Sequence, residues 1–198
     1  NPTLRINIHI FKHDCTVSLD SSGSSLHKRG YRIDSNKAPL NEVLGAGLIL
    51  LSGWDKESNF IDPMCGSGTL LTEAALMYGD VAPGLMRDHY GFLAWEGHNA
   101  DVWEACWQEA CQRQEAGLRK SWPLMMGYDA DTSALRAAEK NIEAAGLSQF
   151  ISLEHRELAQ LPHKPASFGL LITNPPYGER LGETDTAIYL YKALGRLA

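Results

Sequence analysis

The sequence has few of the features that mark membrane, secreted and metal-binding proteins. Its 198 residues contain no apolar run of about eighteen residues, so no transmembrane helix is predicted. The stretch NPTLRINIHIFKHD alternates like a strand and lacks the apolar segment of a signal peptide. The cysteines form no CxxC pair, and the seven histidines do not cluster at metal-ligand spacing. We therefore expect free thiols, a cytoplasmic location and no metal site.

Positive charge is also scarce. The chain has 18 Lys and Arg residues against 24 Asp and Glu residues, a net charge of −6. A free-standing nucleic-acid binder usually carries a basic face. If the substrate is a nucleic acid, local basic patches or another domain must supply the affinity for phosphate. One local candidate is HKRGYR (27–32), where Lys28, Arg29 and Arg32 either contact phosphate or are solvated charges of a linker.

Apolar periodicity predicts strands that alternate with helices. A hairpin is expected over 4–20, with its turn near Lys12–Asp14. Later strands are predicted at 59–62, 123–129, 150–158 and 169–173, and helices at 38–51, 69–78, 131–147 and 184–197. This order is typical of an α/β fold with a parallel, doubly wound sheet. In such sheets ligands bind at the carboxyl ends of the strands.

A glycine-rich turn, DPMCGSGT (62–69), follows the first of these strands. Gly66 and Gly68 allow a tight turn and the close approach of a ligand, and the next helix offers free backbone N–H groups. The turn lacks the GK[ST] of a phosphate-binding loop and is not GxGxxG. Asp62 would repel a pyrophosphate but would accept an ammonium group.

A second acid, Asp129 in GYDAD, ends the next strand. An acid at this place accepts hydrogen bonds from ribose hydroxyls in dinucleotide-binding folds. A ligand with an ammonium group and a ribose but no phosphate fits S-adenosylmethionine (AdoMet). The alternative is a tight turn with ordinary capping acids. Glu157, expected at the tip of the third strand, either faces the adenine ring or is a solvated loop acid.

The stretch NPPY (174–177) follows the last predicted strand. Pro175 and Pro176 donate no backbone hydrogen bonds and favour extended geometry before them. The segment therefore offers two acceptors, the Asn174 side-chain oxygen and the Pro175 carbonyl, and Tyr177 can stack on a flat ring. An exocyclic amine held this way could attack a methyl sulfonium, with catalysis by positioning and electrostatics. The alternative is a Pro-Pro turn that ends a strand.

These motifs carry a family resemblance. DPMCGSGT, GYDAD and NPPYGERLG resemble the AdoMet-dependent class I methyltransferases that modify exocyclic amines. LHKRGYR, APLNEVLGAGLILLSGW and EAALMYGDVAPGL narrow the resemblance to the bacterial 23S rRNA guanine-N2 methyltransferases of the RlmL/RlmKL type. The resemblance implies a class I (Rossmann-like) fold, AdoMet as cofactor, 23S ribosomal RNA as partner, and no membrane.

The resemblance also implies roles for single residues. Those expected to lie along AdoMet are Asp62, Met64, Cys65, Gly66, Ser67, Gly68, Thr69, Asp129, Glu157 and Asn174. Those expected to hold the target guanine, and so to be catalytic, are Asn174, Pro175, Pro176 and Tyr177.

The same resemblance suggests a division of the chain. Residues 1–36 would be strands and linker from an upstream RNA-binding THUMP region, and 37–198 the methyltransferase domain, with a helical insert at about 80–122. Sheets of this class normally have seven strands, whereas the predicted elements stop after the fourth. Since the first residue is not Met, we expect a fragment whose RNA affinity comes largely from absent parts.

Three other functions remain open at this point. Adenine-N6 methylation of DNA or RNA uses the same NPPY chemistry, because adenine also carries an amine on a flat ring. Protein glutamine methylation acts on a flat amide in the same way. A non-catalytic RNA-binding domain is the third alternative. Such a domain tends to lose the acids or the asparagine, whereas Asp62, Asp129 and Asn174 are all present.

Overall fold

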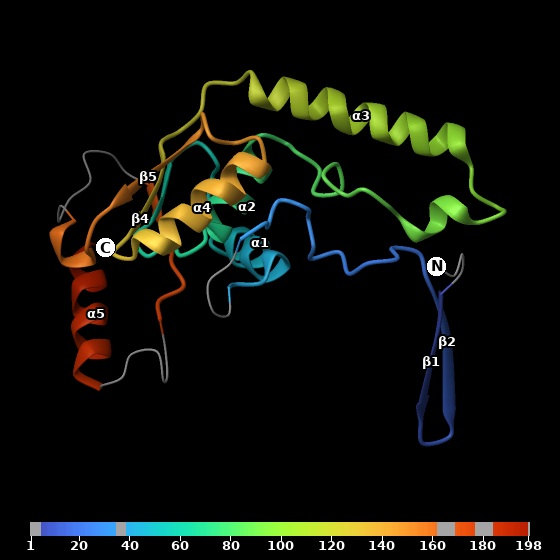
Figure 1. The fold of residues 1–198 in the computed structure, drawn as a ribbon, viewed down its shortest axis with the longest axis horizontal. Coiled ribbons are helices and arrows are strands. Elements are labelled where there is room, and N and C mark those ends of the chain that lie inside the picture. Colours follow the sequence, from blue (N-terminus) through green and yellow to red (C-terminus); the bar gives the residue numbers. More distant parts are fainter. Residues whose placement is uncertain (1–4, 35–38, 162–168, 177–183, 198) are drawn as a thin grey trace.

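A parallel four-stranded sheet forms the centre of the chain (Figure 1). The computed structural model describes residues 5–34, 39–161, 169–176 and 184–197. The strand order is β5-β4-β3-β6, with β3 (Asn59–Asp62), β4 (Met125–Asp129), β5 (Ile151–His155) and β6 (Gly169–Leu171). All three pairings are parallel. The predicted α/β class is confirmed, and the order switches direction at β3, where such sheets bind ligands.

Three helices pack side by side. They are α1 (Glu42–Leu51), α2 (Thr69–Tyr78) and α4 (Thr132–Ala144). The middle helix, α2, contacts both α1 and α4 and lies on β3 and β4. The last helix, α5 (Thr184–Leu197), packs instead against the short 3₁₀ helix η2 (Leu158–Gln160). As a result α5 stands at the carboxyl end of the sheet, beside the site.

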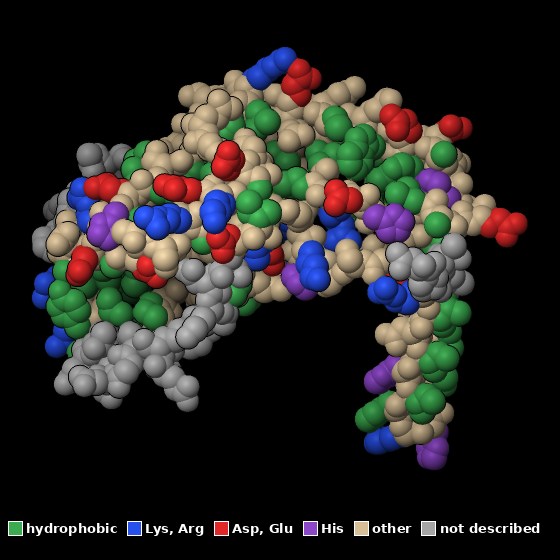
Figure 2. Space-filling model, viewed as in Figure 1, with side chains coloured by type: hydrophobic (Ala, Val, Ile, Leu, Met, Phe, Trp, Pro, Cys, Tyr) green, Lys and Arg blue, Asp and Glu red, His purple; other side chains and the backbone are tan. Residues whose placement is uncertain are grey.

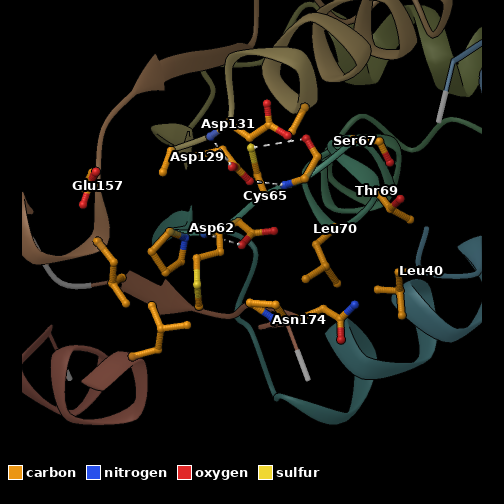
Figure 3. Close-up of a pocket in the computed structure, with 18 of the residues that line it drawn as sticks. Leu40, Asp62, Cys65, Ser67, Thr69, Leu70, Asp129, Asp131, Glu157 and Asn174 are labelled. Carbon is orange, nitrogen blue, oxygen red and sulfur yellow. Dashed lines mark hydrogen bonds between the residues drawn. The ribbon is translucent and has the colours of Figure 1, made fainter. Parts of the chain in front are cut away.

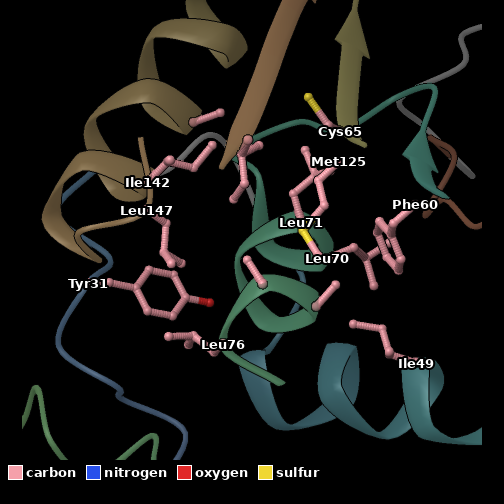
Figure 4. Packing of buried hydrophobic residues seen from close by; sticks show 14 of the residues in the cluster. Tyr31, Ile49, Phe60, Cys65, Leu70, Leu71, Leu76, Met125, Ile142 and Leu147 are labelled. Carbon is pink, nitrogen blue, oxygen red and sulfur yellow. The ribbon is translucent and has the colours of Figure 1, made fainter. Parts of the chain in front are cut away.

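The main core lies between this helical layer and the sheet (Figure 4). Residues 69–76 of α2 are all buried. Phe60, Leu71 and Met125 are each at most 1% exposed, and burying such a side chain stabilises the fold by about 1.5–3 kcal/mol. Thr72 is tolerated there because its hydroxyl donates to the Gly68 carbonyl at 2.9 Å. The core therefore fixes α2, and with it the glycine-rich turn from which α2 starts.

Several predicted boundaries are confirmed. The strand at 59–62 and the helices at 69–78 and 184–197 occur where expected. Asp131 caps α4 by accepting a 2.7 Å hydrogen bond from the Ser133 N–H, and Gly146 follows the helix with φ 71°. Both signals are local. The capping oxygen accepts from a free N–H at the helix start, and the left-handed backbone position after the helix favours glycine.

Two strands are shorter than predicted. β5 ends at His155, because Glu157 already caps η2 and its carbonyl accepts from the Gln160 N–H at 2.9 Å. β6 ends at Leu171, after which the Ile172 N–H donates to the Ile61 carbonyl at 3.0 Å. The predicted strand ends at 158 and 173 were therefore wrong by three and two residues.

The stretch 80–122 contains η1 (Gly91–Ala94) and the long helix α3 (Ala100–Leu118). Trp103 contacts the rings of Tyr90 and Phe92 and forms an aromatic cluster of its own. Trp122 stacks on Phe150 at 3.9 Å and joins this stretch to the main core. The stretch is thus helical, as predicted, while the domain boundaries stay a prediction.

The predicted hairpin is confirmed as β1 (Arg5–Phe11) and β2 (Asp14–Asp20), paired antiparallel from Arg5↔Asp20 to Phe11↔Asp14. It projects from the body in Figure 1. Figure 2 shows hydrophobic side chains along it, and Ile6, Ile8 and Ile10 are more than half exposed.

No helix in the described part of the chain has both the length and the apolarity needed to cross a membrane. The same part of the chain holds no group of three or more His, Cys, Asp or Glu side chains arranged around a common point as metal ligands. The four cysteines are free.

Candidate active site

A cavity of about 430 Å³ opens at the carboxyl ends of the strands (Figure 3). Most of the residues singled out from the sequence line it: Asp62, Met64, Cys65, Gly66, Ser67, Thr69, Asp129, Glu157, Asn174 and Pro176. Gly68 and Pro175 adjoin lining residues, and Tyr177 lies outside the described residues. The fold thus brings together motifs that are more than a hundred positions apart, while their individual roles stay predictions.

The glycine-rich turn depends on two left-handed residues. Gly66 has φ 55° and Gly68 has φ 79°, a region that other residues rarely adopt. A Cβ on Gly68 would lie 3.1 Å from the Cβ of Ala138, so this glycine also lets α2 and α4 approach. A Cβ on Gly66 would meet nothing within 4 Å. The backbone at Gly66 therefore faces open space, as a turn that receives a ligand requires.

Asp129 ties the end of β4 to this turn. Its Oδ2 accepts a 2.8 Å hydrogen bond from the Gly66 N–H, and its Oδ1 accepts a 2.9 Å bond from the Asp131 N–H. A carboxylate offers about four lone-pair sites, so acceptor capacity remains for a ligand. The two backbone bonds hold the carboxylate in one orientation at the cavity wall.

Asp62 is buried at the base of the cavity. Only 1% of it is exposed, and its Oδ1 accepts a 3.2 Å hydrogen bond from the Met64 N–H. Burial raises the pKa of Asp62 to about 7, and the negative charge of Asp129 acts in the same direction. A cationic group in the cavity would oppose both effects and favour the carboxylate. The site is therefore suited to a ligand with a positive charge.

The opposite wall is formed by Asn174 and Pro176, which are half-buried. They lie shortly after β6, the edge strand that pairs with β3, and the Ile172 N–H still bonds to the Ile61 carbonyl at 3.0 Å. Asp62 is seen between Asp129 and Asn174 in Figure 3. The cavity thus has Asp62 and Asp129 on one side and the Asn174 amide with Pro176 on the other.

Some lining residues were not predicted for the site. They are Pro39, Leu40, Pro63, Leu70, Ala130, Asp131, Ala134, Leu158, Ala159, Tyr189 and Leu190. Among these, Asp131 also caps α4. Leu158 could have been found from the sequence, because it directly follows Glu157, which was predicted for the site. Tyr189 and Leu190 belong to α5, and no sequence motif marks them.

The two arginines of the basic stretch 27–32 differ from both of their predicted roles, whereas Lys28 is exposed and its role stays a prediction. Arg29 pairs with Glu73 at 3.3 Å, and Arg32 pairs with Glu42 at 2.8 Å. Their side chains are only 11% and 18% exposed, so they are neither solvated nor displayed for phosphate. Both arginines form ion pairs with buried glutamates of the same chain.

Comparison with known families and proteins agrees with this geometry. Residues 29–198 match the family model described as UPF0020: RMKL-like, methyltransferase domain. The chain belongs to this family. It is 50% identical to two proteins named ribosomal RNA large subunit methyltransferase K/L. One is from Desulfotalea psychrophila and aligns over 200 residues, and the other is from Syntrophotalea carbinolica and aligns over 201 residues. These alignments take in 99% and 98% of the chain but 28% of each relative.

Solved structures of similar sequence have the same fold. The structure of SMU.472 in complex with SAH matches 98% of the chain with a TM-score of 0.87 at 34% identity. A protein described as a predicted N6-adenine-specific DNA methylase from Listeria monocytogenes matches 97% with a TM-score of 0.85, also at 34% identity. The chain spans 49% of each. The resemblance and the Rossmann-like fold predicted from the sequence are confirmed.

Proposed function

We propose that this chain is a methyltransferase module that transfers a methyl group from AdoMet to the exocyclic N2 amine of a guanosine in 23S ribosomal RNA. The observation that carries the proposal is the placement of Asp62, Asp129 and Asn174 around one cavity. The names of the relatives support the RNA substrate, since both are large-subunit ribosomal RNA methyltransferases.

The residues present fit AdoMet. A volume of about 430 Å³ lies within the range of small-molecule sites, about 300–1,000 Å³. Asp62 is a buried acid that a ligand ammonium would stabilise, and Asp129 has acceptors for ribose hydroxyls. Glu157 lies on the same wall and is exposed enough to meet an adenine edge. When bound, AdoMet would supply an electrophilic methyl group.

On the other wall, the side-chain oxygen of Asn174 and the carbonyl of Pro175 accept the two N–H groups of the guanine amine. Holding both hydrogens orients the nitrogen lone pair and stabilises the positive charge that develops on it. With AdoMet bound, the amine would form the new N–C bond as the sulfonium C–S bond breaks, and its proton would then be lost to solvent. A guanine in a stem must first be extruded from its stack. Tyr177 is expected to stack on it.

Affinity for RNA is expected to come largely from outside this chain. The net charge of −6 opposes binding to phosphate, and the two arginines of the basic stretch are engaged in ion pairs. The chain spans 28% of the length of its two relatives, which leaves room for such regions in them.

Methyl transfer to ribosomal RNA tests this function. The intact protein would be incubated with labelled AdoMet and 23S rRNA from cells that lack the gene, and the labelled nucleoside identified after digestion. Label in N2-methylguanosine is expected. Label in N6-methyladenosine would keep the amine clamp but replace the substrate, in line with the description of the Listeria protein. Bound AdoMet without any transfer would indicate a non-catalytic RNA-binding domain.

A further inference from the structure

The segment between the hairpin and the α/β body carries an arginine that reaches the glycine-rich turn. The Arg32 Nε donates to Glu42 at 2.8 Å, and one terminal nitrogen donates to the Ser67 hydroxyl at 3.2 Å. The other terminal nitrogen donates to the Leu40 carbonyl at 2.9 Å and to the Thr69 hydroxyl at 3.0 Å. One guanidinium thus joins the start of α1 to the turn and to the first residue of α2.

The geometry of this contact is specific to arginine. A guanidinium is a flat fork with five donors, whereas an ammonium is a point charge with three. Glu42 is 4% exposed, so its charge needs the partner that Arg32 provides. Lysine could face Glu42 but could not also reach Ser67 and Thr69 from the same plane.

Asn141 of α4 holds the same turn from the other side. It is fully buried, and its Nδ2 donates to the Ser67 carbonyl at 3.1 Å and to the Asp34 carbonyl at 2.9 Å. Its Oδ1 accepts from the N–H groups of Ile33 at 3.0 Å and Asp34 at 3.1 Å. Ser67 is therefore held at its hydroxyl by Arg32 and at its carbonyl by Asn141.

We propose that Arg32 and Asn141 are positioning residues that fix the glycine-rich turn in the shape that binds the cofactor. Among the described residues, the cavity lining includes Ser67 and Thr69 but neither Arg32 nor Asn141, so the effect passes through the turn. A turn held in its binding shape before the ligand arrives spares the ligand the cost of ordering it. The inference rests on the proposed function only where AdoMet is named as that ligand.

The chain offers a matched control in Arg29. It belongs to the same segment, is similarly buried, and pairs with Glu73, which like Glu42 is almost fully buried. Glu73 lies in the second turn of α2, and the Tyr31 hydroxyl also donates to it at 3.0 Å. Arg29→Gln thus removes a comparable ion pair without touching the glycine-rich turn.

The first measurement is amide hydrogen exchange of the intact protein without ligand. The Gly66 and Gly68 N–H groups are hydrogen-bonded to Asp129 and to the Cys65 carbonyl, so their exchange reports opening of the turn. Arg32→Gln is expected to speed exchange over 65–69 at least about tenfold, and Arg29→Gln to leave it within about twofold. Equal exchange over 65–69 in the two variants would overturn the positioning role.

The second measurement is AdoMet affinity and turnover. Arg32→Gln is expected to weaken AdoMet about tenfold, with kcat at saturation within about twofold of the parent, because only the turn is disturbed. Arg32→Lys keeps a charge beside Glu42, so it tests the same point if the glutamine variant does not fold; unchanged affinity and exchange in it would also refute the proposal. If the parent protein binds no AdoMet, the proposed function fails, while the exchange comparison still decides the role of Arg32.

Discussion

The two walls of the cavity are built differently. On the acidic wall, Asp62, the glycine-rich turn and Asp129 are joined to one another and to the core by backbone hydrogen bonds. On the amide wall, Asn174 to Pro176 follow a strand of three residues, and the two prolines have no N–H to donate. The acidic wall is thus held by hydrogen bonds within the chain, whereas we propose that the acceptors of the amide wall are satisfied by the ligand.

Under the proposed function, the two walls would serve two different tasks. A small cofactor of constant shape is best bound by a preformed wall, since preorganisation lowers the cost of binding. A base from RNA would instead be bound by acceptors at the sheet edge, to which its amine can donate. Changes on the acidic wall should therefore alter cofactor affinity, and changes on the amide wall should alter turnover.

The largest effect is expected on the amide wall. Asn174→Ala should lower the rate of methyl transfer by about 10²–10⁴-fold, because it removes an acceptor that acts on developing charge. AdoMet affinity should stay within about twofold. Single-turnover kinetics and calorimetric titration measure the two quantities. A rate within a few-fold of the parent would mean that the amine is not held by Asn174.

On the acidic wall, Asp129→Ala should weaken AdoMet by about 10–100-fold, since a charge-assisted acceptor and the anchor of the Gly66 N–H are both lost. The rate at saturating AdoMet should change much less. Calorimetric titration of the variant with AdoMet measures the affinity, and Asp129→Asn serves as a control of equal size. Parent-like affinity in the alanine variant would remove Asp129 from the cofactor site.

Asp62→Asn should weaken AdoMet while stabilising the protein at pH 8. Burial raises the pKa of Asp62 from 3.8 to about 7, so the folded state loses stability as pH rises from about 4 to 7. Asparagine does not titrate. The variant should thus match the parent near pH 4 and exceed its free energy of unfolding by about 4 kcal/mol above pH 7, since the shift is about three pKa units. Urea unfolding at both pH values checks this, and a pH-independent difference would contradict it.

The smallest effect compares two glycines in the same turn. Gly68→Ala should destabilise the fold by about 2 kcal/mol, because a left-handed alanine is strained and its Cβ would lie 3.1 Å from Ala138. Gly66→Ala carries only the backbone strain, about 1 kcal/mol, since its Cβ would meet nothing. Thermal unfolding of both variants gives the order, and the reverse order would show that packing against α4 does not limit the turn.

The sequence was sufficient wherever the signal is local. The start of α4 at the Asp131 cap, the β3–α2 turn and the alternation of strands and helices follow from capping, left-handed glycines and apolar periodicity. Because carboxyl ends of parallel strands share an edge, Asp62, Asp129 and Asn174 could be expected at one site before their distances were known.

The rest depends on contacts that the sequence does not specify. Val43, Leu44, Leu48 and Leu51 recur at helical spacing, yet all are exposed, and α1 packs through Gly45 and Ile49 instead. Periodicity identified the helix but not the face that packs. The arginines of 27–32 were visible as charges, but Glu73 is 44 positions from Arg29, and no local rule pairs them. Propensity likewise could not distinguish the end of β5 from the start of η2.

The buried arginines also determine where this domain can be cut. A piece that began at residue 37 would keep Glu42 and Glu73 but lose Arg32, Arg29 and Tyr31, the groups that neutralise or hydrogen-bond them. Two acids would then be buried in a helical layer without a counter-charge, an arrangement that typically costs several kcal/mol per ion. We therefore expect a piece that starts upstream of Arg29 to be more stable than one that starts at residue 37. Residues 29–34 thus take part in the packing of the α/β body and are more than a passive linker to it.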